Sequence, residues 1–111
     1  MSDHPSVTQV DELAKELLDD ARQQHTKRAS RTLVTGTSQR VTLIALAEGA
    51  ELAEHGAPSA ATLYVVVGRV RLHTHDKEWA LDPGQLVTIP PQRHGLTADT
   101  DAAVLLTVAL R

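Results

Sequence analysis

Two histidines, His55 and His94, are the residues whose types and spacing could do chemistry. An imidazole can bind a divalent metal, hydrogen-bond a ligand or exchange a proton near neutral pH. Five residues separate Gly49 from His55, and five separate Gly84 from Pro90, which comes shortly before His94. Catalytic zinc sites usually offer three protein ligands, so two imidazoles alone make a poor metal site. The spacing therefore favours contact with a small ligand over a complete metal centre.

A second pair of histidines, His73 and His75, has the spacing of a chelating pair on a strand. Alternate residues of a strand point to the same side, so the two rings would share a face. Val70 and Leu72 take the apolar positions of the same segment. We therefore expect the two histidines to face outward, near a hairpin turn, on the protein surface.

The remaining polar residues give no convincing catalytic group. The acidic residues of 12–20 fall on the polar side of a predicted helix. Glu51 and Glu54 precede His55, and either could serve only as a substitute ligand. Ser59 has no histidine and aspartate partners in the order of a known triad. The chain has no cysteine, which excludes disulfides, thiol catalysis and zinc-thiolate sites.

A helix over residues 8–26 is predicted from apolar residues at three- and four-residue spacing, among them Val10, Leu13 and Leu17. Thr8 is the expected N-cap. Such a helix is marginal alone in water and needs a surface to cover. The outside of its own domain and a second subunit would both serve, and the sequence does not choose between them.

After Ser30 the sequence changes to short apolar or alternating segments separated by Gly, Pro and Asp. This pattern is typical of a β-sandwich or barrel. The predicted strands are 33–35, 41–47, 63–67, 70–74, 78–81, 86–89 and 104–110. Strands apolar on both faces indicate that part of one sheet is covered twice, and a partner subunit is the expected second cover.

Two stretches, residues 49–68 and 84–94, resemble the two conserved blocks of the cupin family. The segments 63–70 and 82–91 carry most of the likeness. The resemblance implies an all-β fold, the cupin double-stranded β-helix or jelly-roll barrel, of six to eight antiparallel strands. It also implies a dimer and a pocket in the barrel mouth. With the predicted helix, this gives an N-terminal helical extension over 1–30 and a cupin barrel domain over 31–111.

In that family a divalent metal is held by three histidines and a glutamate. By the resemblance, His55 matches the first histidine, Ala57 replaces the second and Ala61 replaces the glutamate. His94 is the candidate for the last histidine, one residue earlier than the usual spacing, and Gln92 replaces an expected glycine. Because an alanine methyl group cannot coordinate a metal, the resemblance implies a degenerate metal site.

Composition narrows the possible partners. The chain has 111 residues and a formal net charge of −3, which suits a single domain and argues against nucleic acid. Its one basic cluster, Lys27, Arg28 and Arg31, is interpreted as a solvated helix end. No segment approaches the roughly 20 apolar residues of a membrane span, and Met1 to Pro5 lacks the start of a secretory signal. We therefore expect no membrane partner and a cytoplasmic protein.

The leading prediction is a homodimer that binds a small molecule in the barrel mouth without catalysis and without a cofactor. The expected ligand-binding residues are His55, His94, Leu63, Val65 and Ile89.

Two alternatives remain open. One is an enzyme of the dioxygenase or isomerase type, with Zn, Fe, Mn or Ni bound weakly by His55 and His94. Glu54 or substrate oxygens would then complete the metal shell. The other is a purely structural dimer with a dry core.

Overall fold

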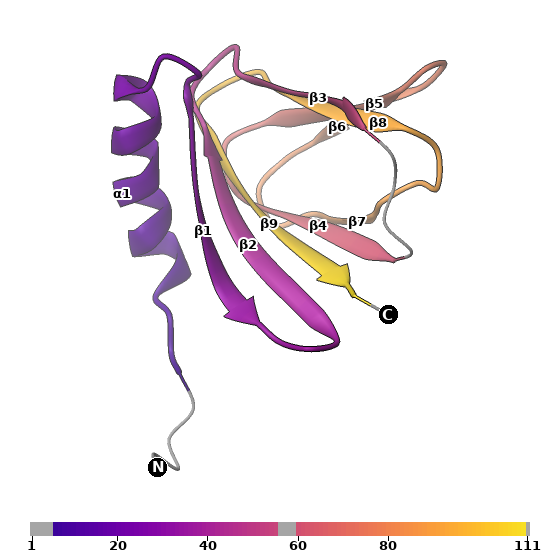
Figure 1. Ribbon diagram of the computed structural model, residues 1–111. Helices are drawn as coiled ribbons and strands as arrows, with labels where there is room; N and C mark the ends of the chain where they lie inside the picture. Colours follow the sequence, from indigo (N-terminus) through magenta and orange to yellow (C-terminus); the bar gives the residue numbers. More distant parts are fainter. Residues whose placement is uncertain (1–5, 56–59, 111) are drawn as a thin grey trace.

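The computed structural model describes residues 6–55 and 60–110, and the side chains of all of these except Glu54 and His55. Helix α1 (Val10–Gln23) is followed by strands that form two sheets facing each other (Figure 1). The strands are β1 (Arg28–Thr35), β2 (Gln39–Leu46), β3 (Glu51–His55), β4 (Ala61–Val67), β5 (Val70–Thr74), β6 (Glu78–Leu81), β7 (Leu86–Thr88), β8 (His94–Ala98) and β9 (Ala102–Ala109).

The larger sheet has the order β1-β2-β9-β4-β7 and the smaller one β3-β8-β5-β6. All of these pairings are antiparallel. Neighbours in space are mostly distant in sequence, because the chain crosses between the sheets several times. This arrangement confirms the predicted jelly-roll barrel with an N-terminal helix.

The core lies between the two sheets. Alternate residues of a strand point to opposite faces, so each strand contributes every second side chain to this interior. Its largest fully buried members are Leu46, Val65, Val70, Leu72 and Val104. Each such side chain contributes roughly 1.5–3 kcal/mol on burial, so the apolar alternation of these strands determines how the sheets pair.

A second apolar layer lies on the outer face of the larger sheet, where α1 packs (Figure 1). Leu13, Leu17 and Leu18 are buried there against Leu43 and Ala45 of β2. The helix thus covers its own chain, which settles a point that the sequence leaves open. The apolar faces of β2 had suggested a partner subunit as the second cover of that strand. The structure places α1 there instead.

The ends of α1 differ from the prediction. The N-cap is Gln9, which makes no side-chain capping bond, so the prediction of Thr8 was wrong. The helix ends at Gln23, and Lys27 takes a positive φ of 61° in the connection that follows. Arg28 then begins β1. The basic cluster is therefore not a helix end, and strand structure begins before the expected boundary at residue 31.

In the described ranges, no helix is long and apolar enough to cross a membrane.

Candidate ligand site between the sheets

His94 faces the interior from the start of β8. Leu96 and Ala98 follow it at alternate positions and are buried in the core, so His94 has the same orientation. Only 6% of its surface is exposed. Its Nδ1 lies 3.1 Å from the carbonyl oxygen of Gln92. Because a carbonyl can only accept, this hydrogen bond requires the proton on Nδ1 and fixes the orientation of the ring.

The backbone of His55 lies directly opposite His94 in the β3–β8 pair. The register runs regularly to Leu52 and Leu96 and then shifts before His55, as in a β-bulge. Without that extra residue, position 54 would face His94 instead. The two sequence-predicted histidines are thus neighbours on paired strands, while the side chain of His55 lies outside the described residues.

Beside His94 is a small hollow that we call the inner cavity, with a volume of about 40 Å³. That is room for about one water molecule. It is lined by His94, Gly95 and seven aliphatic residues, namely Ile44, Leu52, Leu63, Leu72, Ile89, Leu96 and Leu106. Three predicted site residues, His94, Leu63 and Ile89, therefore surround one cavity. The fourth, Val65, is fully buried in the same core but does not line it.

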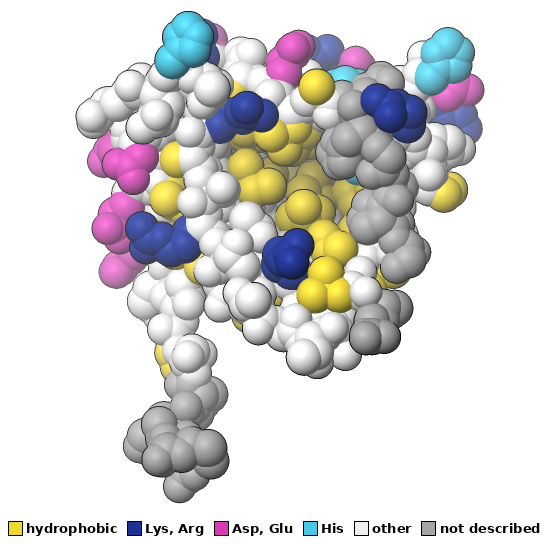
Figure 2. Space-filling view, in the orientation of Figure 1, with side chains coloured by type: hydrophobic (Ala, Val, Ile, Leu, Met, Phe, Trp, Pro, Cys, Tyr) yellow, Lys and Arg dark blue, Asp and Glu magenta, His cyan; other side chains and the backbone are white. Residues whose placement is uncertain are grey.

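A wider hollow of about 310 Å³ adjoins the inner cavity, and we call it the entrance hollow. Its lining residues are Thr26, Arg28, Ala29, Ser30, Ile44 and Leu52. Ile44 and Leu52 belong to the walls of both hollows, which places the two next to each other. In Figure 2, hydrophobic side chains line an open depression between the sheets, with Lys and Arg side chains around it. The entrance is polar on the β1 side and apolar towards His94.

The donors that the structure describes do not fit a metal centre. Ala61, at the position of the family's glutamate, is buried at the start of β4 and offers only a methyl group. Across the described ranges, no group of three His, Cys, Asp or Glu could hold a metal ion. Ala57, at the second histidine position, lies outside the described residues, as do the side chains of His55 and Glu54.

The second histidine pair and the aromatic residues Tyr64 and Trp79 do not line the inner cavity. His73 is on the outer face of β5, with its Nε2 3.3 Å from the Thr97 hydroxyl, and His75 is exposed in the following turn. Tyr64 is 39% exposed on the outer face of β4. Trp79 is 38% exposed on β6. His73 and Tyr64 thus point outward, as strand alternation predicts, whereas Trp79 pairs with the core residue Leu72 and lies on the same face as it.

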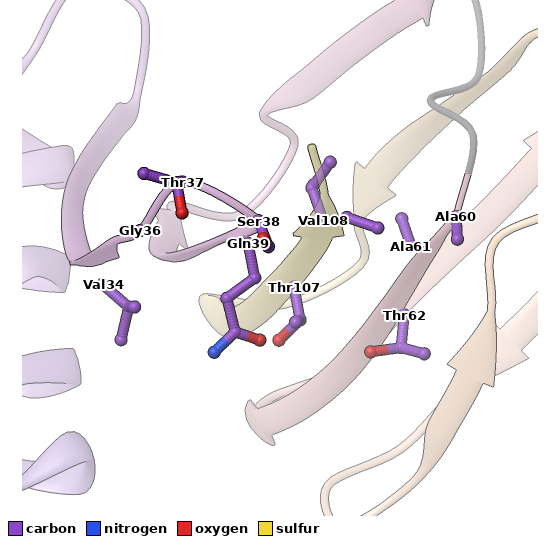
Figure 3. A pocket seen from close by; sticks show the side chains of 11 residues that line it. Val34, Gly36, Thr37, Ser38, Gln39, Ala60, Ala61, Thr62, Thr107 and Val108 are labelled. Atoms are coloured by element: carbon purple, nitrogen blue, oxygen red, sulfur yellow. The ribbon is translucent and has the colours of Figure 1, made fainter. Parts of the chain in front are cut away.

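A separate groove of about 580 Å³ lies at one end of the larger sheet (Figure 3). The β1–β2 turn and the adjoining ends of β4 and β9 line it. In the close-up, Thr62, Thr107 and Gln39 extend to one side of the sheet and Val108 to the other. The groove holds no histidine or carboxylate, so it offers little chemistry beyond hydroxyl and amide contacts.

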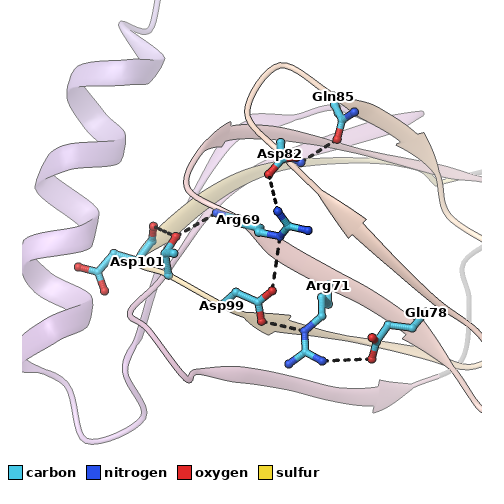
Figure 4. A network of polar contacts seen from close by, with 8 residues as sticks. Arg69, Arg71, Glu78, Asp82, Gln85, Asp99 and Asp101 are labelled. Carbon is cyan, nitrogen blue, oxygen red and sulfur yellow. Dashed lines mark hydrogen bonds and ion pairs between the residues drawn. The ribbon is translucent and has the colours of Figure 1, made fainter.

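Arginines and carboxylates form a network on the smaller sheet and its turns (Figure 4). Arg71 Nε lies 2.7 Å from Asp99, and Arg71 also contacts Glu78 at 3.3 Å. Arg69 joins Asp99 to Asp82. The hydrogen bond to Asp99 is the main reason that the pKa of Arg71 is raised above its usual value. The arginines and carboxylates of this network pair with one another, and the network faces away from the inner cavity.

The sequence matches the family Cupin_2, described as "Cupin domain", over residues 42–109, which is more than half of the chain. The chain belongs to the cupin family. No curated protein matches it. The match covers β2 to β9 and therefore both walls of the inner cavity.

Solved structures with the same fold match either almost all of this chain or about three quarters of it. A conserved protein of unknown function from Streptococcus pyogenes has a TM-score of 0.73 and 21% identity, covering 97% of this chain and 90% of that one. An RmlC-like cupin from Desulfovibrio desulfuricans has a TM-score of 0.69 and 21% identity, and the match covers 98% of this chain and 96% of that one. KdgF from Halomonas sp. has a TM-score of 0.67 and 20% identity, and the match covers 76% of this chain and 81% of that one. At these identities the likeness supports the fold alone.

Several residues around this site are not among the sequence predictions. Leu52 and Leu96 lie on β3 and β8, two strands that the sequence pattern did not reveal. Leu72 was predicted to face the core but not to line the site. Arg28 was assigned to a helix end. The inward alternation of His94, Leu96 and Ala98 is the signal that could have identified Leu96.

Proposed function

We propose that this cupin binds a small organic molecule at the entrance hollow and inner cavity, without catalysing its conversion. The observation that carries the proposal is one buried, oriented imidazole at the end of an otherwise aliphatic cavity that adjoins a wider hollow. Ligand sites in proteins are concave, mostly apolar and provided with a few polar groups that fix orientation. His94 is such a group here, and Leu63 and Ile89 provide apolar contact.

The enclosed volume limits the ligand. About 40 Å³ beside His94 accepts a single small group, whereas about 310 Å³ in the entrance hollow accepts a short chain or ring. Scarce aromatic residues give no stacking platform for a sugar ring. The site therefore suits a small, partly aliphatic molecule that carries a polar group.

A thermal-shift screen of small organic acids and short sugars tests this proposal, because a ligand that binds only the folded state raises its Tm. Compounds that raise the Tm should lose that effect in His94→Ala and in Ile89→Trp, which fills the cavity. They should keep it in Tyr64→Ala, the matched change on the outer face. A screen without any stabilising compound, or hits that respond equally to all three variants, would contradict ligand binding at this site.

One observation favours a metal-dependent enzyme as the second candidate: the backbones of His55 and His94 are direct partners. The donors described so far are too few for such a centre, so we derive no reaction step from it. Elemental analysis of the purified protein, His55→Ala and His94→Ala tests this alternative. If the purified protein contains stoichiometric metal, both variants lose it and His73→Ala retains it, the enzyme is the better account and the binding proposal is wrong.

We further propose that the chain forms a homodimer through the outer face of the larger sheet, beside α1. Tyr64 and Leu86 lie opposite each other on β4 and β7, and Leu86 is 65% exposed. Leu105, the partner of Tyr64 on β9, packs against the helix cluster. An exposed apolar pair that continues a buried layer is a natural place for a second copy to bind.

A further inference from the structure

Arg28 lies on the interior side of the larger sheet, at the edge of the entrance hollow. It is the first residue of β1 and pairs with Leu46, which belongs to the core between the sheets. Residues directly opposite on paired strands share a face, so Arg28 has the orientation of Leu46. Its Nη1 lies 3.5 Å from the carbonyl oxygen of Glu51 in β3. The side chain therefore reaches from one sheet towards the other across the opening.

No carboxylate among the described side chains neutralises the charge of Arg28. Arg22, Arg69 and Arg71 each contact a carboxylate at 2.7–3.7 Å. Among the side chains that the structure describes, that of Arg28 forms no ion pair, and its bond to the Glu51 carbonyl is its one hydrogen bond. A guanidinium carries five N–H donors, which leaves most of them for another partner. The position thus has an available positive charge at the edge of an apolar hollow.

The wall beside Arg28 is aliphatic. Ile44 and Leu52 form it and lead to the inner cavity, and Ser30 adds a hydroxyl on the β1 side. A ligand complementary to this surface has one anionic end and a short apolar body. A guanidinium binds a carboxylate through two parallel hydrogen bonds, and one positive group balances one negative charge.

We propose that the entrance hollow binds small aliphatic carboxylates, with the carboxylate on Arg28 and the chain between Ile44 and Leu52. The inference rests on the proposed function and specifies its ligand class. It concerns recognition only and includes no reaction.

Hexanoate and hexanol are the probes, because they share a chain and differ in the charged group. Titration calorimetry on the full chain should show hexanoate binding about tenfold more tightly than hexanol, since a charge-assisted bidentate pair is stronger than a neutral hydrogen bond. In Arg28→Gln the two affinities should become equal, with hexanol unchanged. Arg31→Gln is the matched control. Arg31 lies on the same strand and also forms no ion pair with a described residue, but its strand partner Leu43 belongs to the opposite face of the sheet.

Equal affinities for the two probes in the unaltered protein overturn the inference, and this comparison needs no variant to fold. An equal loss in Arg28→Gln and Arg31→Gln also overturns it, because general charge attraction would then explain binding. In both cases the proposed function stands if uncharged compounds still bind beside His94. Failure of the proposed function is recognised separately, when neither probe and no compound of the screen binds.

Discussion

Gly68 and Gly84 show how residue identity is dictated by one backbone angle and one neighbour. Both have positive φ, 80° and 88°, which side chains other than glycine rarely adopt. At Gly68 an added Cβ would meet Ala102 Cα at 2.7 Å and the carbonyl oxygen of Asp101, whereas at Gly84 it would meet open space. The first glycine is therefore needed for two reasons and the second for one.

Replacing these glycines by alanine separates the two reasons. We expect each change to lower the free energy of unfolding by about 1–2 kcal/mol because of the positive φ. Gly68→Ala should cost roughly 1–3 kcal/mol more, because backbone atoms must move. Urea unfolding of the two variants measures the difference. Equal losses of unfolding free energy would show that the backbone at Asp101 and Ala102 moves aside without an energetic penalty.

Asp101 connects three parts of the molecule through one carboxylate. One oxygen accepts the Glu48 backbone N–H at 2.8 Å, and the other lies 2.7 Å from Arg22 Nε of α1. The hydrogen bond from Glu48, and then that from Arg22, lower the pKa of this carboxyl group. The carboxylate thus joins the helix, the β2–β3 turn and the β8–β9 turn.

A lowered pKa in the folded state means that the ionised form of Asp101 favours folding. Its contribution is complete above the ordinary aspartate pKa of about 3.9 and is lost as the pH falls through the folded-state value. We expect Asp101→Asn to lower the unfolding free energy by about 1 kcal/mol at pH 7. The gap from the unaltered protein should narrow in acid. Unfolding curves at several pH values measure it.

Asp19→Asn is the control, because Asp19 also contacts Arg22 but is 72% exposed and has no backbone partner. Exposed pairs of this kind are worth little, so the change should be small at every pH. If both variants behave alike, the link from Arg22 to Glu48 has no special role.

At the scale of elements, α1 owes its place to one apolar stripe. Leu17 is 3% exposed and packs in the layer that includes Leu43 of β2. Leu17→Ala should lower the unfolding free energy by about 2–4 kcal/mol, because it removes buried methyl groups and leaves a cavity. Glu16→Ala, at the adjacent exposed position, should change it little. Chemical denaturation that shows no loss for Leu17→Ala would mean that the helix is not docked in solution.

How far the sequence predicts the elements depends on how regularly they alternate. Strands β5 and β6 have the predicted bounds because Val70, Leu72 and Leu81 mark one face clearly. Strands β3 and β8 were missed because their segments mix His, Gly, Glu and Thr with single apolar residues. The bulge in β3 cannot be derived from alternation, because it breaks that rule. Arg28 was misassigned because the helix was extended to residue 26.

At the scale of the whole molecule, the fold was predictable and the site only in part. The barrel was predicted because residues 49–68 and 84–94 resemble the two conserved blocks of the cupin family. His94, Leu63 and Ile89 surround one cavity: Leu63 lies on β4, His94 begins β8 and Ile89 directly follows β7. Whether they bind a ligand stays a prediction, as does the division of the chain at residues 30 and 31.

The proposed dimer belongs to this scale as well. Sedimentation velocity at micromolar concentration should show a dimer for the unaltered chain and a monomer for Leu86→Lys, because a charge at the centre of an apolar contact is costly to bury. Val7→Lys, another exposed apolar position, is the control and should remain dimeric. A monomer for the unaltered chain would refute the dimer.

The arginine–carboxylate network on the smaller sheet has a consequence for contacts between molecules. Removing water from Arg69, Arg71 and their acidic partners would carry a large desolvation penalty, and an aliphatic surface could not compensate it. The outer faces of the two sheets therefore differ in the free-energy cost of their desolvation. Crowded solutions should bring copies together through the helix-bearing wall and leave the opposite wall hydrated.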